Sequence, residues 1–279
     1  DQYPPNTNYG TEYSREQINT ALQSGNPYDL VPSKDLNGHG TMMAGIAGGR
    51  DMPDKGFYGV ATDAEYVVVK LKEAKPYLRE FFRIPEGAVA YQTNDIMFGV
   101  KYVSDKAREL GRPIAICLGL GTSLASHDGL EPLSLYLSEV GDISGNAVVV
   151  AVGNEGNGRR HYFGTVDFTV GYDTVELNVG ENETGFSMML WGNRPSIYSL
   201  DILTPGGEYI PRIPARINEN QDATFIFEKT RISIDYQMIQ TPAGDQMILL
   251  RFTNPSPGIW RFRVYDVMKP SAGFHIWLP

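Results

Sequence analysis

Two patterns of hydrophobic and polar residues divide this chain. Up to about residue 163, apolar positions with helical spacing alternate with short, continuous apolar runs. From about residue 164 onward, apolar and polar positions alternate in short segments broken by Gly, Pro and Asn. The first pattern predicts strands and helices in alternation, and the second predicts antiparallel strands. We therefore expect two domains, residues 1–163 and 164–279.

The first domain is expected to be α/β, with a mostly parallel sheet covered by helices on both faces. Continuous apolar runs predict buried strands at 65–71, 113–120 and 146–154, and helical spacing predicts helices at 11–25, 93–111 and 130–140. In the first helix Ser14 is the expected N-cap, Gln17 completes a capping box and Gly25 follows the end. In the second, one face carries Ile96, Val100 and Val103, and Gly111 terminates the helix.

The second domain is expected to be an all-β, jelly-roll-like sandwich. Period-two alternation predicts strands within seven segments: 174–180, 186–192, 196–210, 223–229, 231–239, 246–267 and 273–279. The tryptophans are spread along these segments, which favours core or edge packing over a carbohydrate platform: Trp191, Trp260 and Trp277.

Composition and charge argue against several classes of protein, among them nucleic-acid-binding and membrane-spanning proteins. The net charge of −9 and the lack of a basic run argue against a nucleic-acid partner. No apolar run has the length of a membrane span, and the first residues carry no signal-peptide pattern, so they are expected to lie inside a longer protein. The single cysteine, Cys117, lies in an apolar run and is predicted to be a buried small hydrophobe.

The densest chemical signal is the segment 35–49, DLNGHGTMMAGIAGG, where His39 stands between glycines before a run of small residues. Such a run lets a helix pack closely against a neighbouring backbone. Gly-His-Gly alone is weak, because a chain of this size also contains structural histidines. The full pattern of His, Gly, Thr and two Ala-Gly pairs resembles the histidine motif of the subtilisin-like serine proteases, with the second Ala-Gly pair one residue early.

A second motif lies in VVVAVGNEGN, which resembles the strand of the same family that ends in Ala-x-Gly-Asn-x-Gly. The resemblance implies that the Asn154 amide donates to the oxyanion, whereas without His39 the same residues would be read as a turn after a strand. A fixed amide donor of this kind is worth roughly 3 to 4 kcal/mol in the transition state. The two motifs stand in family order, 115 residues apart.

Ser123 lies in a glycine-flanked stretch, GLGTSLASHDG, that suggests a nucleophile. In the family the serine follows the oxyanion asparagine, so Ser123 is not expected to be catalytic. The stretch instead resembles the strand that forms one wall of the substrate cleft, with Gly119 where the family usually has serine. On this resemblance an extended peptide would bind between two backbone segments, Leu118, Gly119, Leu120 and Gly121 on one side and Ala151, Val152 and Gly153 on the other.

The rest of a catalytic triad is missing. No aspartate motif precedes His39, and no Gly-Thr-Ser-x-Ala follows Asn154. Either the chain is a central fragment whose aspartate and serine lie outside it, or it is a decayed homologue that binds without catalysis. The fragment is favoured, because decay usually leaves the scaffold in place with the reactive residue substituted. The chain alone is expected to be inactive.

Longer stretches, among them ELNVGENETGFSMMLWG and PSPGIWRFRVY, resemble the clostridial subtilases that include the Csp spore-germination proteases. In that group a jelly-roll segment is inserted between the asparagine and the serine. The resemblance implies a serine endopeptidase with a peptide or protein substrate, a propeptide partner, no cofactor, and a spore-associated or extracellular location. Two rival hypotheses stay open: a pseudoprotease that regulates a partner protease, and a β module that binds glycan or peptide.

The other polar residues near these motifs are expected to have no catalytic role. Asp35, Asp51 and Asp54 surround the histidine motif without the spacing of a calcium loop and are expected to be solvated, so no metal site is predicted. His127 and Asp128 are expected to form a turn. His161 is expected to be exposed.

Overall fold

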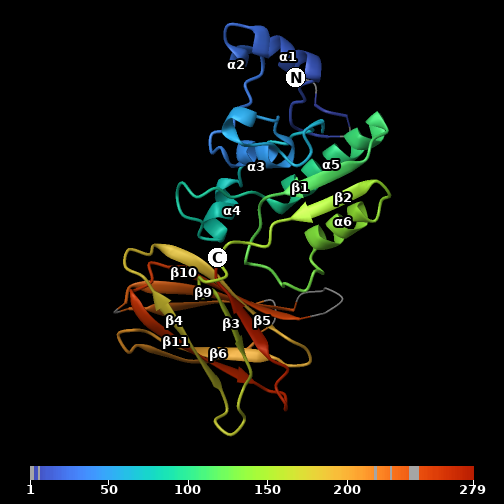
Figure 1. Ribbon diagram of the computed structural model, residues 1–279. Coiled ribbons are helices and arrows are strands. Elements are labelled where there is room, and N and C mark those ends of the chain that lie inside the picture. The colour runs from blue at the N-terminus through green and yellow to red at the C-terminus, as the bar shows by residue number, and fades with distance from the viewer. Residues whose placement is uncertain (1–2, 6, 217–218, 227, 239–244) are drawn as a thin grey trace. The chain divides into compact units, whose positions relative to one another are not determined.

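The computed structural model describes residues 3–5, 7–216, 219–226, 228–238 and 245–279. Residues 227 and 239, which belong to two of the predicted strand segments, lie outside this set. The chain forms two compact units (Figure 1). The first holds residues 1–72, 93–119 and 140–149, and the second holds 73–92, 120–139 and 150–279. The division into domains at residues 163 and 164 stays a prediction.

The three helices predicted at 11–25, 93–111 and 130–140 are present, together with further helical segments. They are α1 (Arg15–Gln23), α2 (Pro27–Leu30), α3 (His39–Gly48), the 3₁₀ turn η1 (Pro53–Lys55), α4 (Pro76–Phe81), α5 (Thr93–Leu110) and α6 (Pro132–Gly141). Ser14 caps α1 and forms the predicted capping box with Gln17. On α5 the predicted face of Ile96, Val100 and Val103 is buried, and the helix ends before Gly111, whose φ of 63° breaks the helical path.

Two of the three predicted strands of the α/β part are present, β1 (Ile114–Leu118) and β2 (Asn146–Val150), and they form a two-stranded sheet joined through α6. The third is wrong: residues 65–71 form no strand, and Val67, Val68 and Val69 are exposed. The segment instead packs on α5, because Val69 and Leu71 lie beside the position of a Cβ on Gly99. An apolar run becomes a strand only where another strand bonds to its backbone.

Burial in the α/β part is also lower than predicted. In β1 only Ile116 is buried, and Cys117, predicted to be buried, is exposed. In β2 Val149 and Val150 are exposed. The two-stranded sheet has too few layers around it to cover both faces, so the continuous apolar run does not have the burial expected of a parallel sheet.

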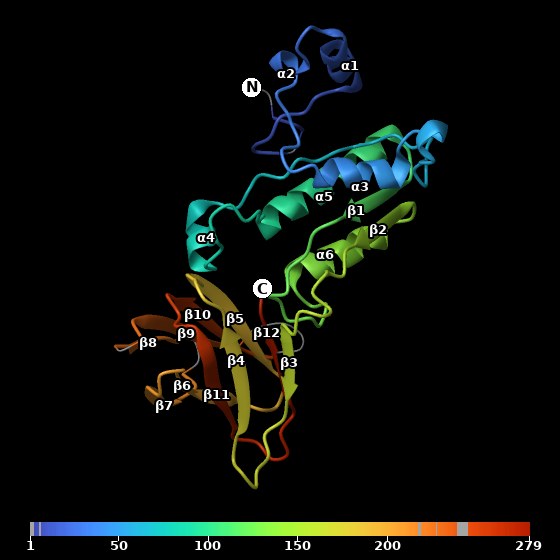
Figure 2. The same cartoon turned by 60° about the vertical axis from the view of Figure 1, so that its left-hand side comes forward.

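The remaining strands form two antiparallel sheets, visible as separate layers (Figure 2). One has the order β3-β12-β5-β10-β9-β8 and the other β4-β11-β6-β7. Their bounds are β3 His161–Gly164, β4 Asp173–Val179, β5 Gly185–Gly192, β6 Tyr198–Leu203, β7 Tyr209–Ile213, β8 Glu219–Phe225, β9 Thr230–Met238, β10 Gln246–Thr253, β11 Gly258–Asp266 and β12 Phe274–Trp277. Antiparallel pairing therefore predominates among the described strands, as expected for residues 164–279, whereas the α/β sheet expected in residues 1–163 consists of β1 and β2 in the described part of the chain.

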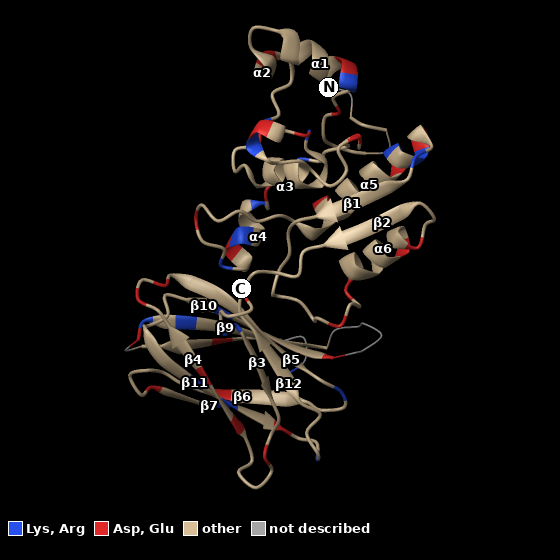
Figure 3. Cartoon of the chain, viewed as in Figure 1, with Lys and Arg blue, Asp and Glu red and all other residues tan. Residues whose placement is uncertain are grey.

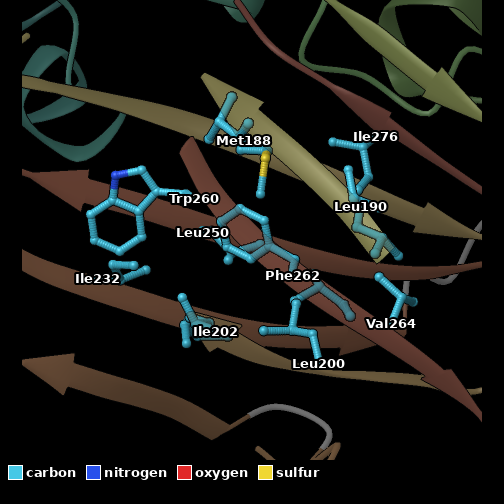
Figure 4. Close-up of a cluster of buried hydrophobic side chains, with 14 of the residues drawn as sticks. Met188, Leu190, Leu200, Ile202, Ile232, Leu250, Trp260, Phe262, Val264 and Ile276 are labelled. Atoms are coloured by element: carbon cyan, nitrogen blue, oxygen red, sulfur yellow. The ribbon is translucent and has the colours of Figure 1, made fainter. Parts of the chain in front are cut away.

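One apolar core joins the two sheets, as the sandwich prediction requires. Figure 4 shows side chains of β5, β9, β10 and β12 facing those of β6 and β11. Trp260 is fully buried and meets Phe225 and Phe252 edge to face, with ring centroids 5.4 and 5.8 Å apart. Successive side chains of each strand point to opposite faces of its sheet, and the core is formed by the set that points toward the other sheet.

A second, smaller cluster explains why residues 73–92 and 120–139 belong to the same unit as the sandwich. Met189, Trp191, Met247 and Leu249 contact Phe82 and Leu124 from these two segments, together with Trp277. The Ser187 hydroxyl also donates to the Phe82 carbonyl at 2.9 Å. The sheet β3-β12-β5-β10-β9-β8 is thus covered on its second face by a helix and a loop from the α/β part of the sequence.

Candidate functional site

His39 is the first residue of α3, as the histidine motif predicts. The chain turns into the helix at Gly38, whose φ of 85° is a left-handed conformation that glycine adopts without strain. Gly38 has no side chain to cap the helix. The N-terminal N–H groups of α3 must therefore be satisfied from elsewhere.

Asp35 supplies that cap. Its carboxylate accepts hydrogen bonds from the backbone N–H groups of Asn37, Gly38 and Thr41 at 3.1, 2.8 and 2.9 Å, and from the Thr41 hydroxyl at 2.7 Å. The Thr41 hydroxyl and these N–H groups hold the pKa of Asp35 well below its usual range. Asp35 is exposed, as expected, and in addition caps α3. The Asp-to-Thr spacing around a helix start was the signal that could have shown this cap.

The small residues of α3 allow the close backbone approach that the sequence predicts. The segment 59–61 bonds to the end of the helix: Gly59 donates to the Gly49 carbonyl at 2.9 Å and Ala61 to the Ala47 carbonyl at 2.9 Å. A Cβ on Gly48 would lie 2.6 Å from the Ala61 carbonyl oxygen, so only glycine fits there. The C-terminal end of α3 is thereby held by backbone hydrogen bonds to residues 59–61.

The His39 ring lies beside Gly119. A Cβ built on Gly119 would be 3.3 Å from Cε1 of His39 and 2.9 Å from Cε of Met43. His39, Met43 and Gly119 all belong to the first compact unit, so this grouping does not depend on the placement of the second. The structure thus brings the predicted histidine to the end of the predicted cleft strand, directly after Leu118, the last residue of β1.

A second grouping lies in the other unit, where the chain leaves the two paired strands. Gly121 is adjacent to Ala151, since a Cβ on Gly121 would lie 3.9 Å from the Ala151 carbonyl oxygen. Val152 is 99 % exposed and Gly153 has a φ of 94°. The segment is thus open to solvent at Val152.

Asn154 follows as an exposed residue in a bend. Its backbone N–H donates to the Glu155 carboxylate at 2.8 Å. Leu120, Gly121, Ala151, Val152, Gly153 and Asn154 all lie in the second unit, whereas Leu118, Gly119 and His39 lie in the first. The structure therefore places the predicted site residues in two groups, each with its own local order.

Ser123 lies in the loop before α6, where its carbonyl oxygen is 2.9 Å from Nε2 of His127. The predicted turn at His127 and Asp128 is present: His127 has a φ of 60°, and Asp128 accepts from the Leu130 N–H at 2.8 Å. His161 is exposed as expected, and it stacks on Trp277 at 3.8 Å between ring centroids.

Lys and Arg are spread over helices, loops and strands in both units (Figure 3). Over residues 3–5, 7–216, 219–226, 228–238 and 245–279, no group of three or more His, Cys, Asp or Glu side chains is arranged to hold a metal ion. Within the same residues, no helix is long and apolar enough to cross a membrane.

The histidine at a capped helix start and the glycine-rich ends of two paired strands are features of a subtilisin-like fold, and comparison with known proteins agrees. The profile of the subtilase family, peptidase S8, matches residues 6–179, so this chain belongs to the subtilase family of serine proteases. The match includes both His39 and Asn154.

Among solved structures, the chain is similar to the CspB protease of Clostridium perfringens, with a TM-score of 0.81 and 27 % sequence identity. The alignment covers 97 % of this chain and 55 % of that chain, so this chain spans about half the length of the protein it matches. The resemblance to the clostridial Csp-type subtilases is confirmed.

Proposed function

We propose that this chain is the central part of a subtilisin-like serine endopeptidase, with the catalytic aspartate and serine outside residues 1–279. The observation that carries the proposal is the position of His39, the first residue of a capped helix, beside Gly119 at the end of β1. Family membership supplies the reaction class, hydrolysis of peptide bonds in proteins. The 55 % coverage of the CspB chain supports the fragment hypothesis.

In the intact protein His39 takes the proton of the nucleophilic serine and later returns it to the leaving amine. The Asn154 side chain donates to the oxyanion of the tetrahedral intermediate. The substrate peptide lies between Leu118–Gly121 and Ala151–Gly153 and bonds to their backbone groups. Neither group of residues can hydrolyse a peptide without the aspartate and serine, so the isolated chain is inactive.

In the intact protein the sandwich is a jelly-roll-like insert that lies in the sequence between the asparagine motif and the catalytic serine. Support comes from its antiparallel sheets and its separate core. A propeptide would be the natural first occupant of the cleft, because it presents the same extended backbone as a substrate.

The test uses the intact parent protein and a peptide substrate. Asn154→Ala is expected to lower kcat by roughly 100 to 1,000-fold and to change KM little, because the amide acts on charge that develops in the transition state. His39→Ala is expected to lower kcat further. Asn157→Ala, in the same exposed loop, is the matched control and should keep wild-type kcat.

The outcome separates the rival hypotheses. A parent protein that binds peptide but hydrolyses none would be the pseudoprotease, and wild-type kcat in Asn154→Ala would reduce the asparagine motif to a strand and a turn. Ligand binding retained by residues 164–279 with no peptidase activity in the parent would favour the β module. Thermal unfolding of each variant distinguishes lost catalysis from lost folding.

A further inference from the structure

Two side chains of α3 meet the same point on the cleft strand. His39 and Met43 are one helical turn apart, so their side chains lie on one face of α3. Measured from the position of a Cβ on Gly119, Cε1 of His39 is at 3.3 Å, and Cε and Cγ of Met43 are at 2.9 and 3.4 Å. The Met43 thioether thus occupies the volume that a side chain at residue 119 would need.

Glycine is not required at residue 119 by the backbone. Its φ lies outside the left-handed region, unlike that of Gly38 or Gly153. Any residue could adopt this conformation, so the reason for glycine at this position is space. The space is taken by a long, flexible side chain that fills irregular gaps well.

We propose that Met43 and Gly119 form a size-matched pair that fixes the ring of His39, which makes Met43 a positioning residue of the site. The inference rests on the proposed function, in which His39 is the general base. The ring is exposed and meets Gly119 through the carbon Cε1. Packing against Gly119 and Met43 therefore restricts the ring while both nitrogens stay available for proton transfer.

The test measures the ring directly by NMR on the chain of residues 1–279. In the wild type, NOEs are expected from the Gly119 α protons to the His39 Hε1 proton and to the Met43 methyl group. Gly119→Ser places a Cβ 2.9 Å from the Met43 methyl and 3.3 Å from Cε1 of His39, so both NOEs should weaken and the His39 Hε1 resonance should shift. Adding Met43→Ala removes the clash and should restore the wild-type shift of His39.

Gly121→Ser is the matched control, since a Cβ there meets only the Ala151 carbonyl oxygen, at 3.9 Å. An unchanged His39 resonance in Gly119→Ser would overturn the proposal, as would an equal shift in Gly121→Ser. If Gly119→Ser fails to fold, Met43→Ala must restore folding together with the wild-type His39 resonance. Failure of that second substitution to restore either property also overturns the proposal.

Activity of the intact parent gives an independent readout. Gly119→Ser should lower kcat by about 100-fold with little change in KM, the effect expected of a catalytic group displaced by about 1 Å. Met43→Ala in the same protein should recover most of the loss. If the wild-type parent hydrolyses no peptide, the proposed function fails, while the NMR result still decides whether Met43 and Gly119 position the ring.

Discussion

The Asp35 carboxylate binds Thr41 twice, through the backbone N–H at 2.9 Å and through the side-chain hydroxyl at 2.7 Å. These bonds hold the start of α3 across the Gly38 turn, so the backbone of His39 is fixed between two bonded residues. The hydrogen bonds of Asp35 go to Asn37, Gly38 and Thr41. Asp35 therefore influences the position of His39 by holding the start of α3.

Asp35→Ala should lower the melting temperature and broaden the His39 resonance, because the first turn of α3 loses its cap. The pKa of Asp35 is lowered, so its contribution to stability is present above its ordinary pKa and is lost as the pH falls through the lowered value. Thermal melts between pH 7 and pH 2 check this, with Asp51→Ala as the exposed control. An equal change in both variants would contradict the cap.

The close packing of α3 predicts opposite effects for two glycines of the same helix. Gly48→Ala should destabilise the protein by about 1 to 3 kcal/mol, because its Cβ would meet the Ala61 carbonyl oxygen at 2.6 Å. Gly45→Ala faces open space and should instead gain up to about 1 kcal/mol from helix propensity. Denaturant unfolding measures both free energies, and a loss in Gly45→Ala as large as in Gly48→Ala would refute the contact.

Two isoleucines of the sandwich differ in burial, so their replacement should change the free energy of unfolding by different amounts. Ile248 of β10 is fully buried, whereas Ile226 is 78 % exposed. Ile248→Ala should cost about 2 to 5 kcal/mol, since it leaves a cavity. Ile226→Ala should change stability by less than about 0.5 kcal/mol. Urea unfolding followed by tryptophan fluorescence measures the difference, and similar values would show that the sandwich core is not the one described.

A column of stacked histidine and tryptophan rings in the second unit predicts that stability depends on pH. His127 and His161 stack on Trp277 at 3.7 and 3.8 Å between centroids, and Nε2 of His161 lies 2.9 Å from Nδ1 of His275. Partial desolvation of the rings lowers the pKa of His161 and of His275, and repulsion from the neighbouring imidazoles lowers it further. The charged neighbours in sequence are Asp128 beside His127 and Arg160 beside His161.

Because these pKa values are lowered, the column stabilises the fold above the ordinary histidine pKa, and the stabilisation is lost as the pH falls through the lowered values. The melting temperature should therefore fall between about pH 7 and pH 5. His161→Phe keeps a ring available to stack on Trp277 without a titrating group, and should reduce this dependence. His39→Gln, outside the column, should leave it unchanged; a pH dependence untouched by His161→Phe would count against the column.

The sequence alone determined the elements whose signals are local. The capping box of Ser14 and Gln17, the buried face of α5 and the alternation of burial along β4 all depend on residues a few positions apart, and each is present. The motifs around His39 and Asn154 likewise indicated the family, because their residues are contiguous in the chain.

Only the tertiary structure decided the features that depend on contacts between residues far apart in the sequence. Residues 65–71 have the composition of a strand but pack on α5 instead, and Cys117 is exposed although its neighbours are apolar. The pairing of β3 with β12 joins segments more than a hundred residues apart. The contact of Met43 and His39 with Gly119 is of the same kind: a local pattern fixes which face of an element is apolar, but only the packed chain fixes which backbone that face meets.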